Sequence, residues 1–352
     1  GSHREPDYLA RLITEFRVTT AHFVPSMLQA FLEEPATKSL PSLRRVFASG
    51  EALSWSTVRQ FADRIGCPLF NLYGPTEAAV DVSAWTCVAG ATPHAIPIGR
   101  PIANTRIHVL DDNMRRVPVG VPGELFIGGA NLARGYVNLP GLTAERFVEN
   151  PFAGEVGEEH RLYKTGDRAR WRSDGELEYL GRLDSQVKLR GFRIELGEIE
   201  TVLRDHDAVA DAATSVVGGT RIVAWIVPAR EDKPADAILR AHLQARVPDH
   251  MVPTTFVSLT HLPLGPSGKL DRGALPEPET VPAAPSDHAV SPEEVEMTAI
   301  WSDVLDVPSV GRDQNFFEAG GDSIRAIQVA ARARSAGMEV TPALLLENQT
   351  IA

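Results

Sequence analysis

The chain of 352 residues is 43% hydrophobic and 23% charged, a composition typical of globular proteins and a length that allows two or three domains. Its formal net charge of −11 argues against a general nucleic-acid-binding or membrane-surface protein, because both need a basic face. No apolar run reaches transmembrane length and no signal-peptide pattern is present, so we expect a cytoplasmic protein. The two cysteines, Cys67 and Cys87, are too few for a disulfide framework or a cysteine metal cluster.

Residues 1–95 alternate between helical and strand patterns. Amphipathic helices are predicted at "PDYLARLITEF" and "STVRQFADRIG", and short apolar strands at "VTTAHFV", "RRVFASG" and "PLFNLYG". This alternation predicts an α/β region with a largely parallel sheet. Because a helical pattern follows "GSH" almost at once, we expect the chain to begin inside a domain.

The rest of the chain changes character three times. Residues 96–183 contain short strands between Gly, Pro and Asp turns, which predicts a β-rich subdomain. Residues 184–276 read as a small α+β unit, and residues 277–290 are rich in Pro and Ala and predict a linker. Residues 291–352 have helical periods in "EEVEMTAIWSDVL" and "SIRAIQVAARARSA", which predict a small helical bundle.

The segment "NLYGPTEAAVD" (71–81) follows an apolar strand. In open α/β sheets, ligands bind beyond the carboxyl ends of the strands. An aromatic ring here can stack on a base, a threonine can bond a phosphate oxygen, and a glutamate can hold Mg²⁺. The alternative is a tight turn after a strand.

Two further segments carry charged groups in turns. Asp167, in "YKTGDRARW", can accept hydrogen bonds from two ribose hydroxyls, and "GRLDSQVKLRG" groups three cations with a carboxylate between two predicted units. Lys269, in "LPLGPSGKLDR", can deliver a positive charge to an anionic transition state, although the spacing is not that of a P-loop. The alternatives are a polar linker and an ordinary exposed lysine.

The segment "FFEAGGDSIRA" (316–326) places Ser323 after two glycines and at the start of a helical pattern. Ser and Asp commonly cap helices by accepting hydrogen bonds from the first free N–H groups. By itself the segment therefore predicts a capped helix.

Read in order, these segments resemble an adenylation domain of a nonribosomal peptide synthetase followed by its peptidyl carrier protein. The resemblance covers nearly the whole chain and rests on "NLYGPTE", "GELFIGGANLARGYVNLPGLTAERF", "YKTGDRARW", "GRLDSQVKLRGFRIELGEIE", "LPLGPSGKLDR" and "FFEAGGDSI". It implies the C-terminal portion of an adenylate-forming core, a small α+β subdomain, and an all-α four-helix carrier bundle. It also implies ligase activity that uses ATP and Mg²⁺ to form aminoacyl-AMP and then a thioester.

The resemblance implies roles for residues of the nucleotide site. Tyr73 would stack on adenine with Asn71 near its amino edge, and Thr76 would meet the phosphate. Asp167 would hold the ribose hydroxyls, with Arg182 close to them.

Three further residues act in the half-reactions that the resemblance implies. Glu77 would bind Mg²⁺, and Lys269 would bridge the substrate carboxylate and the phosphate. Asp184 would be the hinge about which the small subdomain rotates between the two half-reactions.

Ser323 would accept phosphopantetheine from a phosphopantetheinyl transferase, because it matches the serine of the carrier motif. Capping and modification are compatible, since the N-terminus of a helix also favours a phosphate. Asp322 precedes this serine, at a position where many carriers of this family have His. In the family, an Asp at this position often accompanies an epimerisation domain downstream, so the resemblance implies such a domain here.

Six positions of the side-chain pocket fall in this chain, namely His22, Phe47, Ser49, Leu72, Val80 and Asp81. A large apolar substrate would leave the polar members of this set unpaired, so a small hydroxylated amino acid is expected. The series is similar to the family's pattern for serine, including that of enterobactin-type synthetases. The alternative is that His22 and Asp81 pair with each other as a structural contact.

The family's upstream half, with its phosphate loop, is absent, so this chain alone is not expected to complete an ATP site. Two alternatives stay open: an acyl- or aryl-CoA ligase, and a non-catalytic carrier or docking fragment. The partners implied are the amino acid, the transferase, neighbouring condensation and epimerisation domains, and an MbtH-like protein, with no nucleic acid and no membrane.

Overall fold

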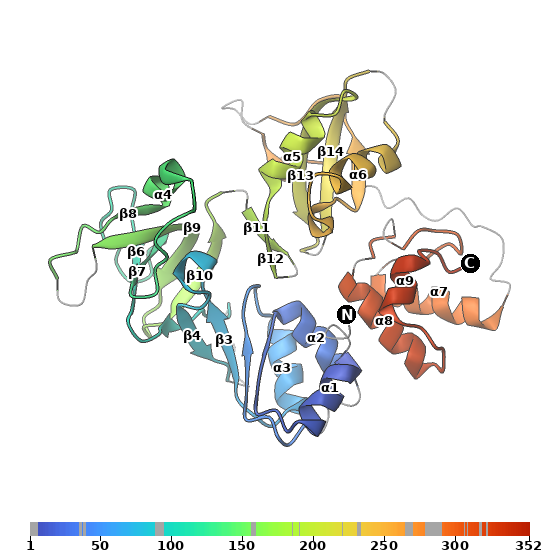
Figure 1. Cartoon of the computed structure of the whole chain (residues 1–352), viewed down its shortest axis with the longest axis horizontal. Helices are drawn as coiled ribbons and strands as arrows, with labels where there is room; N and C mark the ends of the chain where they lie inside the picture. Colours follow the sequence, from blue (N-terminus) through green and yellow to red (C-terminus); the bar gives the residue numbers. More distant parts are fainter. Residues whose placement is uncertain are drawn as a thin grey trace. The chain divides into compact units, whose positions relative to one another are not determined.

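A computed structural model gives the fold of the chain (Figure 1). It describes residues 6–34, 37, 40–88, 95–155, 160–184, 186–189, 191–219, 221–230, 234–264, 270–278, 291–305, 307, 309–316, 319–321 and 323–352. The chain forms two compact units, one over Pro6–Asp184 and the other from Ser185 to the C-terminus.

The first unit begins with a five-stranded sheet in the order β1-β2-β3-β4-β5. Its strands are β1 (Thr20–Phe23), β2 (Arg45–Ala48), β3 (Leu69–Tyr73), β4 (Ser83–Thr86) and β5 (Arg100–Pro101). The first three run parallel, and β4 and β5 are antiparallel to their neighbours. The predicted α/β region is confirmed, but its sheet is mixed rather than largely parallel, with two parallel and two antiparallel pairings.

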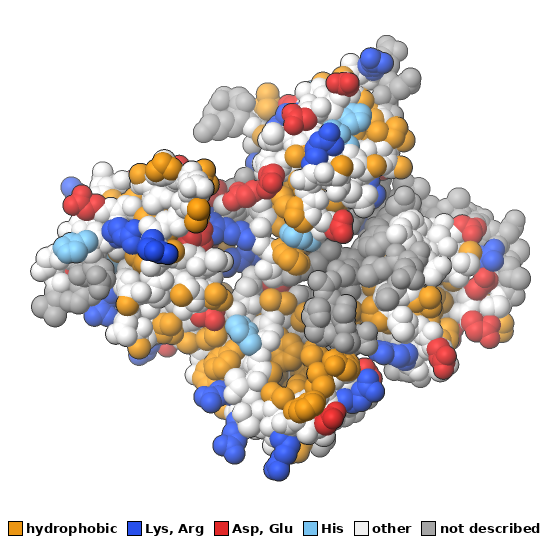
Figure 2. All heavy atoms as spheres, viewed as in Figure 1, with side chains coloured by type: hydrophobic (Ala, Val, Ile, Leu, Met, Phe, Trp, Pro, Cys, Tyr) orange, Lys and Arg blue, Asp and Glu red, His pale blue; other side chains and the backbone are white. Residues whose placement is uncertain are grey.

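Three helices pack on this sheet: α1 (Pro6–Glu15), α2 (Pro25–Glu33) and α3 (Trp55–Arg64). The hydroxyl of Ser54 caps α3 by accepting a hydrogen bond of 3.1 Å from the Thr57 backbone N–H. Phe31 of α2 and Phe61 of α3 are buried in the same hydrophobic core as Val46 of β2. Hydrophobic side chains also gather on the surface over α1 to α3 (Figure 2).

A second, antiparallel sheet follows, in the order β10-β9-β7-β6 with β8 on β9. Its elements are β6 (Thr105–Leu110), β7 (Gly123–Gly129), α4 (Pro140–Arg146), β8 (Phe147–Glu149), β9 (Arg161–Trp171) and β10 (Leu177–Arg182). Leu125 and Ile127 of β7 are fully buried and pack with Tyr163 of β9. The β-rich subdomain is therefore confirmed.

The second unit starts with a small α+β region. It contains the hairpin β11 (Gln186–Leu189) and β12 (Phe192–Glu195), then α5 (Leu196–Arg204), β13 (Val209–Val217), β14 (Arg221–Pro228), α6 (Asp236–Gln244), η4 (Asp249–Met251), β15 (Thr255–Ser258) and η5 (Arg272–Ala274). β14 lies between β13 and β15, and α5 and α6 contribute Ile199 and Leu239 to the core.

One buried carboxylate joins distant segments of this α+β region. Glu200 of α5 is 6% exposed and accepts hydrogen bonds from Arg272 (2.7 Å) and from the Thr214 backbone N–H (2.9 Å). The Arg272 guanidinium also donates to the Thr214 carbonyl at 3.2 Å. α5, β13 and the turn at η5 are thereby held together.

The C-terminal segment is all-α. Its described residues form α7 (Pro292–Leu305), α8 (Ser323–Ser335) and α9 (Pro342–Glu347). Fully buried Trp301 and Phe316 meet edge to face, with ring centroids 4.7 Å apart. The predicted all-α segment is confirmed, and its described residues contain three of the four expected helices. Within the described ranges, no helix combines the length and apolar character needed to cross a membrane.

Glycine is needed at both positions before α8, for a different steric reason at each. Gly320 has a φ of +97°, in the left-handed region that favours glycine. A Cβ on Gly321 would lie 2.4 Å from the Phe316 ring. The "GG" of this motif therefore lets the chain turn sharply against the core just before Ser323.

Candidate functional site

The buried end of β3 carries the first two predicted site residues. Asn71 and Tyr73 are 5% and 6% exposed. The Asn71 side-chain amide donates to the Pro97 carbonyl at 2.8 Å, and the Tyr73 hydroxyl donates to Asp167. Burial, together with the nearby Asp167 carboxylate, raises the pKa of Tyr73 well above its usual value. Tyr73 is therefore a hydrogen-bond donor throughout the neutral pH range.

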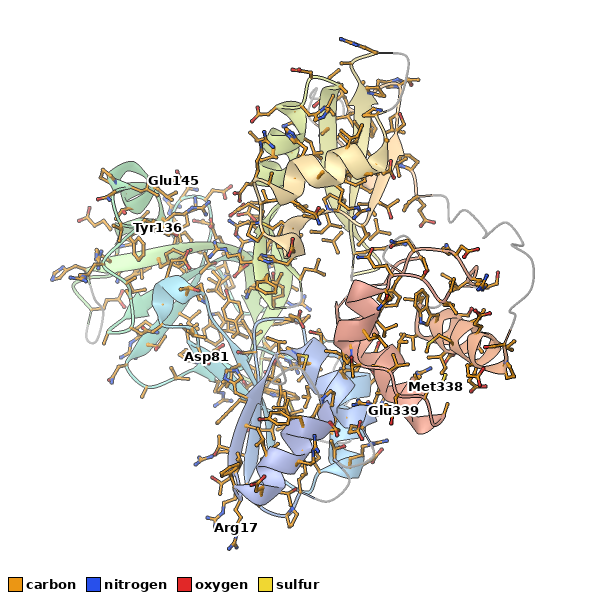
Figure 3. All side chains as sticks on the ribbon, turned by 45° about the vertical axis from the view of Figure 1, so that its right-hand side comes forward. Arg17, Asp81, Tyr136, Glu145, Met338 and Glu339 are labelled. Atoms are coloured by element: carbon orange, nitrogen blue, oxygen red, sulfur yellow. The ribbon has the colours of Figure 1, made fainter. Side chains whose placement is uncertain are left out.

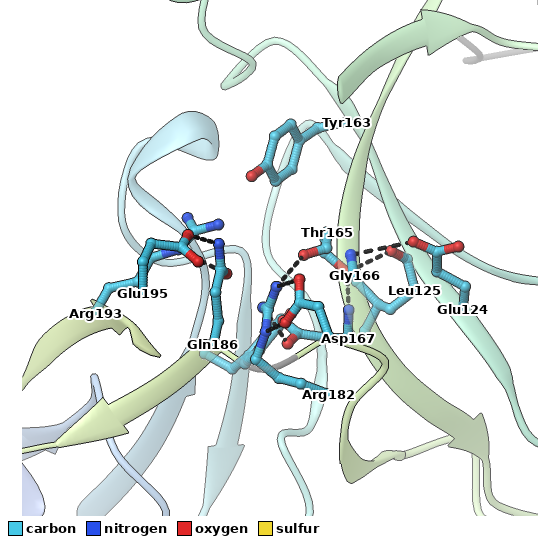
Figure 4. A network of polar contacts seen from close by, with 12 residues as sticks. Glu124, Leu125, Tyr163, Thr165, Gly166, Asp167, Arg182, Gln186, Arg193 and Glu195 are labelled. Carbon is cyan, nitrogen blue, oxygen red and sulfur yellow. Dashed lines mark hydrogen bonds and ion pairs between the residues drawn. The ribbon is translucent and has the colours of Figure 1, made fainter. Parts of the chain in front are cut away.

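Asp167 lies at the centre of a polar network (Figure 4). Arg182 donates to Asp167 Oδ1 at 2.7 Å and makes two bonds of 2.6 Å to the Asp184 carboxylate. Burial opposes the charge on Arg182, but Asp184 and Asp167 outweigh it and raise the pKa of the guanidinium. The predicted neighbours Asp167 and Arg182 are in direct contact, and Asp184 belongs to the same network.

Gly166 makes room for this network. Its φ is +75°, and a Cβ there would lie 2.8 Å from Arg182 Nη2 and 3.0 Å from Asp184 Oδ2. The Gly166 N–H also donates to Glu124 Oε1 at 3.2 Å. The glycine of "KTGD" is thus required by close approach as well as by backbone conformation.

The turn after β3 is strained. Thr76 and Glu77 lie in η3 (Thr76–Ala78), and the next two residues, Ala79 and Val80, have φ values of 57° and 76°. A positive φ is a true outlier for β-branched valine, and such strain clusters at functional sites. A Cβ on Gly74 would lie 2.3 Å from the Val80 carbonyl oxygen, so the turn folds back closely on the end of β3.

Glu77 is held by a residue that the sequence analysis missed. The Tyr136 hydroxyl donates to Glu77 Oε1 at 2.6 Å, and the Ala133 N–H donates to the Glu77 carbonyl at 2.8 Å. Tyr136 lies within the "GELFIGGANLARGYVNLPGLTAERF" motif, but nothing in the local pattern pairs it with a carboxylate 59 residues away.

The residues present fit a magnesium ion held together with substrate phosphates. In the part of the chain that the structure describes, no group of three or more His, Cys, Asp or Glu side chains could hold a metal ion. Mg²⁺ is commonly bound by one or two carboxylates plus phosphate oxygens rather than by an all-protein cage. The half-buried Glu77 carboxylate, beside exposed Thr76, meets that requirement.

The predicted side-chain pocket residues lie at the carboxyl ends of β1, β2 and β3. His22 of β1 pairs with Phe47 of β2, and its Nε2 lies 2.7 Å from the Ser49 hydroxyl. The His22 and Phe47 rings meet edge to face at 6.2 Å. Leu72 is on β3, and Val80 follows in the strained turn. Asp81 comes directly after Val80 and is labelled in Figure 3. Parallel strands bring these ends to one edge of the sheet.

The remaining predicted residues are Lys269, Asp322 and Ser323. Lys269 lies outside the described residues, as does Asp322. On either side of the lysine segment, Leu264 and Leu270 form an antiparallel bridge, and the Asp271 N–H donates to the Pro263 carbonyl at 2.9 Å. Ser323 is the first residue of α8.

The two cysteines lie near the start of β3, and the Cys87 thiol interacts with the Asn71 backbone. Both cysteines line a cavity of about 260 Å³ between α3 and the start of β3. Burial raises the pKa of Cys67, and it raises the pKa of Cys87 to about 12. Because the thiolate is the nucleophile, neither cysteine is suited to carry an acyl group at neutral pH.

We expect Cys87 to react slowly with iodoacetamide and in a strongly pH-dependent way. In a Cys67→Ser variant, the rate should rise about tenfold per pH unit from pH 7 to 9, because the thiolate fraction grows in that proportion well below the pKa. Denatured chain is the control, since its thiol titrates near its ordinary pKa of about 8.5. A plateau near pH 8.5 in the folded protein would contradict the raised pKa.

Three family models match the chain in collinear order. They are AMP-binding enzyme over residues 1–137, AMP-binding enzyme C-terminal domain over residues 198–269, and Phosphopantetheine attachment site over residues 296–352. The fold, the site and these matches define an adenylate-forming enzyme region joined to a carrier domain.

Relatives and solved structures narrow this class. The chain is 48% identical over 360 residues to phosphinothricin tripeptide synthetase PhsB of Streptomyces viridochromogenes, covering 99% of this chain and 30% of that protein. It is 41% identical over 370 residues to enterobactin synthase component F of Escherichia coli, covering 100% of this chain and 28% of that protein.

Among solved structures, the chain is similar to holo-PA1221, an NRPS protein containing adenylation and PCP domains bound to a vinylsulfonamide inhibitor. The two sequences are 30% identical, and the TM-score is 0.78. The match covers 98% of this chain and 58% of that one. This chain belongs to the adenylation and carrier region of nonribosomal peptide synthetases. It spans about 30% of the length of the curated relatives named above.

Proposed function

We propose that this chain is part of a synthetase module that activates an amino acid as aminoacyl-AMP and loads it onto its own carrier domain. The observation that carries the proposal is the Tyr73–Asp167–Arg182 cluster beyond the end of β3, in a chain that also matches a phosphopantetheine attachment site. The residue cluster is the proposed nucleotide site, and the attachment site would supply the thiol of a tethered phosphopantetheine arm.

In the first half-reaction, a carboxylate oxygen of the amino acid attacks the α-phosphorus of ATP, and pyrophosphate leaves. Asp167 accepts hydrogen bonds from the ribose hydroxyls, and Arg182 orients that carboxylate through its hydrogen bond to Oδ1. Asn71 and the Tyr73 ring border adenine, and Thr76 donates to a phosphate oxygen. Lys269 stabilises the negative charge that develops on the reacting groups.

Mg²⁺, when bound beside Glu77, supplies charge neutralisation for the phosphates. In the second half-reaction, Ser323 would hold the phosphopantetheine arm, which would supply the thiol nucleophile for the aminoacyl carbonyl, with AMP as the leaving group. We propose that backbone rotation at Asp184 exchanges Lys269 for the thiol between the two steps.

The amino acid that fits the proposed pocket best is L-serine. His22 and Ser49 form a polar pair near the Phe47 ring, and Asp81 lies in the turn after β3. A site built to hydrogen-bond a hydroxyl rejects an analogue without it more strongly than one with an extra methyl group. We therefore rank serine first, threonine second and alanine last.

Amino-acid-dependent ATP–pyrophosphate exchange tests this proposal, in an adenylation-competent protein that contains this chain. Serine is expected to exceed alanine in kcat/KM by at least about tenfold. Ser49→Ala removes the partner of His22 and should reduce that preference, whereas Ser302→Ala in α7 is the matched control. Equal rates with alanine and serine would contradict the serine assignment but would still support the proposed adenylation activity.

Two other functions predict different results in the same assay. An acyl- or aryl-CoA ligase would show ATP–pyrophosphate exchange that depends on a carboxylic acid, and it would transfer the acyl group to free CoA. The matched phosphopantetheine attachment site favours a covalently attached thiol acceptor instead. A non-catalytic carrier or docking fragment would give no exchange with any amino acid. The proposed partners are a phosphopantetheinyl transferase, neighbouring condensation and epimerisation domains, and an MbtH-like protein.

A further inference from the structure

Tyr136 contacts the carboxylate that the proposed function gives to Mg²⁺. Its hydroxyl donates to Glu77 Oε1 at 2.6 Å, a short bond typical of a donor to an ionised acceptor.

Tyr136 is itself held in place by several contacts. Its N–H donates to the Thr143 hydroxyl of α4 at 2.9 Å, and its ring meets Phe147 edge to face at 5.8 Å. The Tyr163 hydroxyl lies 3.4 Å from that of Tyr136. A Cβ on the preceding Gly135 would lie 2.4 Å from the Thr143 side chain. The hydroxyl is thus presented from a fixed ring.

The same segment holds the backbone of the turn that carries Glu77. The Ala133 N–H donates to the Glu77 carbonyl at 2.8 Å, and the Asn131 side chain donates to the Ala78 carbonyl at 3.1 Å. The next residue of the turn, Ala79, has a positive φ. Contacts from outside the turn stabilise such a backbone, because strain persists only where the surroundings over-determine it.

We propose that Tyr136 is a positioning residue that orients the Glu77 carboxylate for a divalent cation. The inference rests on the proposed function, in which Glu77 holds Mg²⁺. Groups that hydrogen-bond a metal-ligating carboxylate fix its orientation and raise the affinity of the site. Tyr136 acts through Glu77 and is not itself a ligand in this proposal.

The test is Tyr136→Phe, which removes one hydroxyl and keeps the ring that packs on Phe147. Mn²⁺ with ATP, without amino acid, is titrated by the relaxation rate of water protons in the adenylation-competent protein. The dissociation constant for Mn²⁺ should rise about 10- to 100-fold. Tyr8→Phe in α1 makes the same chemical change on another element and should leave this constant and the melting temperature unchanged.

Activity gives a second readout that a purely structural role would not produce. In pyrophosphate exchange, Tyr136→Phe should shift the half-saturating Mg²⁺ concentration upward by a similar factor and approach the parent rate at saturating Mg²⁺. A lower rate at every Mg²⁺ concentration, with no shift of the midpoint, would overturn the proposal.

Glu77→Gln separates this inference from the proposed function. If Glu77→Gln leaves Mn²⁺ binding unchanged, the assignment of Glu77 to the metal is wrong and the inference is wrong with it. If Glu77→Gln weakens binding and Tyr136→Phe does not, only the inference is overturned. We expect the double variant to bind Mn²⁺ no more weakly than Glu77→Gln alone, because Tyr136 acts through that carboxylate.

Discussion

Replacement of Ser323 by alanine is expected to abolish attachment of phosphopantetheine to this chain. Incubation of the parent protein with CoA and a phosphopantetheinyl transferase should add one arm, and the Ser323→Ala variant should add none. The physical reason is that the phosphodiester forms on the serine hydroxyl, which alanine lacks. α8 begins at this residue, and the first N–H groups of a helix favour a negatively charged phosphate.

Intact mass spectrometry measures this result directly. Ser302→Ala in α7 is the matched control. It removes a hydroxyl from another helix of the same C-terminal segment and should leave the mass gain unchanged. The melting temperature of both variants should match that of the parent protein. A full mass gain in Ser323→Ala would mean that another residue carries the arm.

Lys269→Ala is expected to lower the adenylation rate by about 10²–10³, the usual effect of removing one preorganised charge contact with a transition state. The loss should appear in pyrophosphate exchange at saturating ATP and amino acid. Thioester formation from preformed aminoacyl-AMP should be affected much less, because we propose that the lysine leaves the site before that step.

Lys164→Ala is the control for this variant. Lys164 lies on β9 and faces Glu124 at 3.8 Å, so its loss removes a positive charge without removing a proposed site residue. It should leave both half-reactions near the parent rates. Equal losses in both half-reactions of Lys269→Ala would show that the lysine supports the structure rather than adenylation.

The elements of the fold could be predicted because their signals are local. The alternation of helices and strands in the first unit, the turn-rich β region and the helical C-terminal segment each follow from residue periodicity over a short stretch. The motif order then placed Asp167 and Arg182 near each other, and they are in direct contact. The domain boundaries and the individual site roles stay predictions.

The contacts that build the site could not be predicted, because they depend on packing between distant segments. The Tyr73–Asp167 bond spans 94 residues and the Tyr136–Glu77 bond spans 59. No local pattern marks either partner for the other. The steric reason for Gly321, its close approach to the Phe316 ring, likewise has no signal in the sequence.

The buried carboxylate of Glu200 has a consequence for chimeric synthetases. It pairs at 2.7 Å with Arg272, 72 residues further along the chain. Loss of Arg272 removes a charge-assisted hydrogen bond to this buried carboxylate and leaves Arg204, at 3.7 Å, as its remaining ion-pair partner, so we expect the region to be destabilised. An exchange of sequence between two synthetases with its crossover between residues 200 and 272 draws the two partners from different parents. Crossovers that keep both residues from one parent preserve this ion pair.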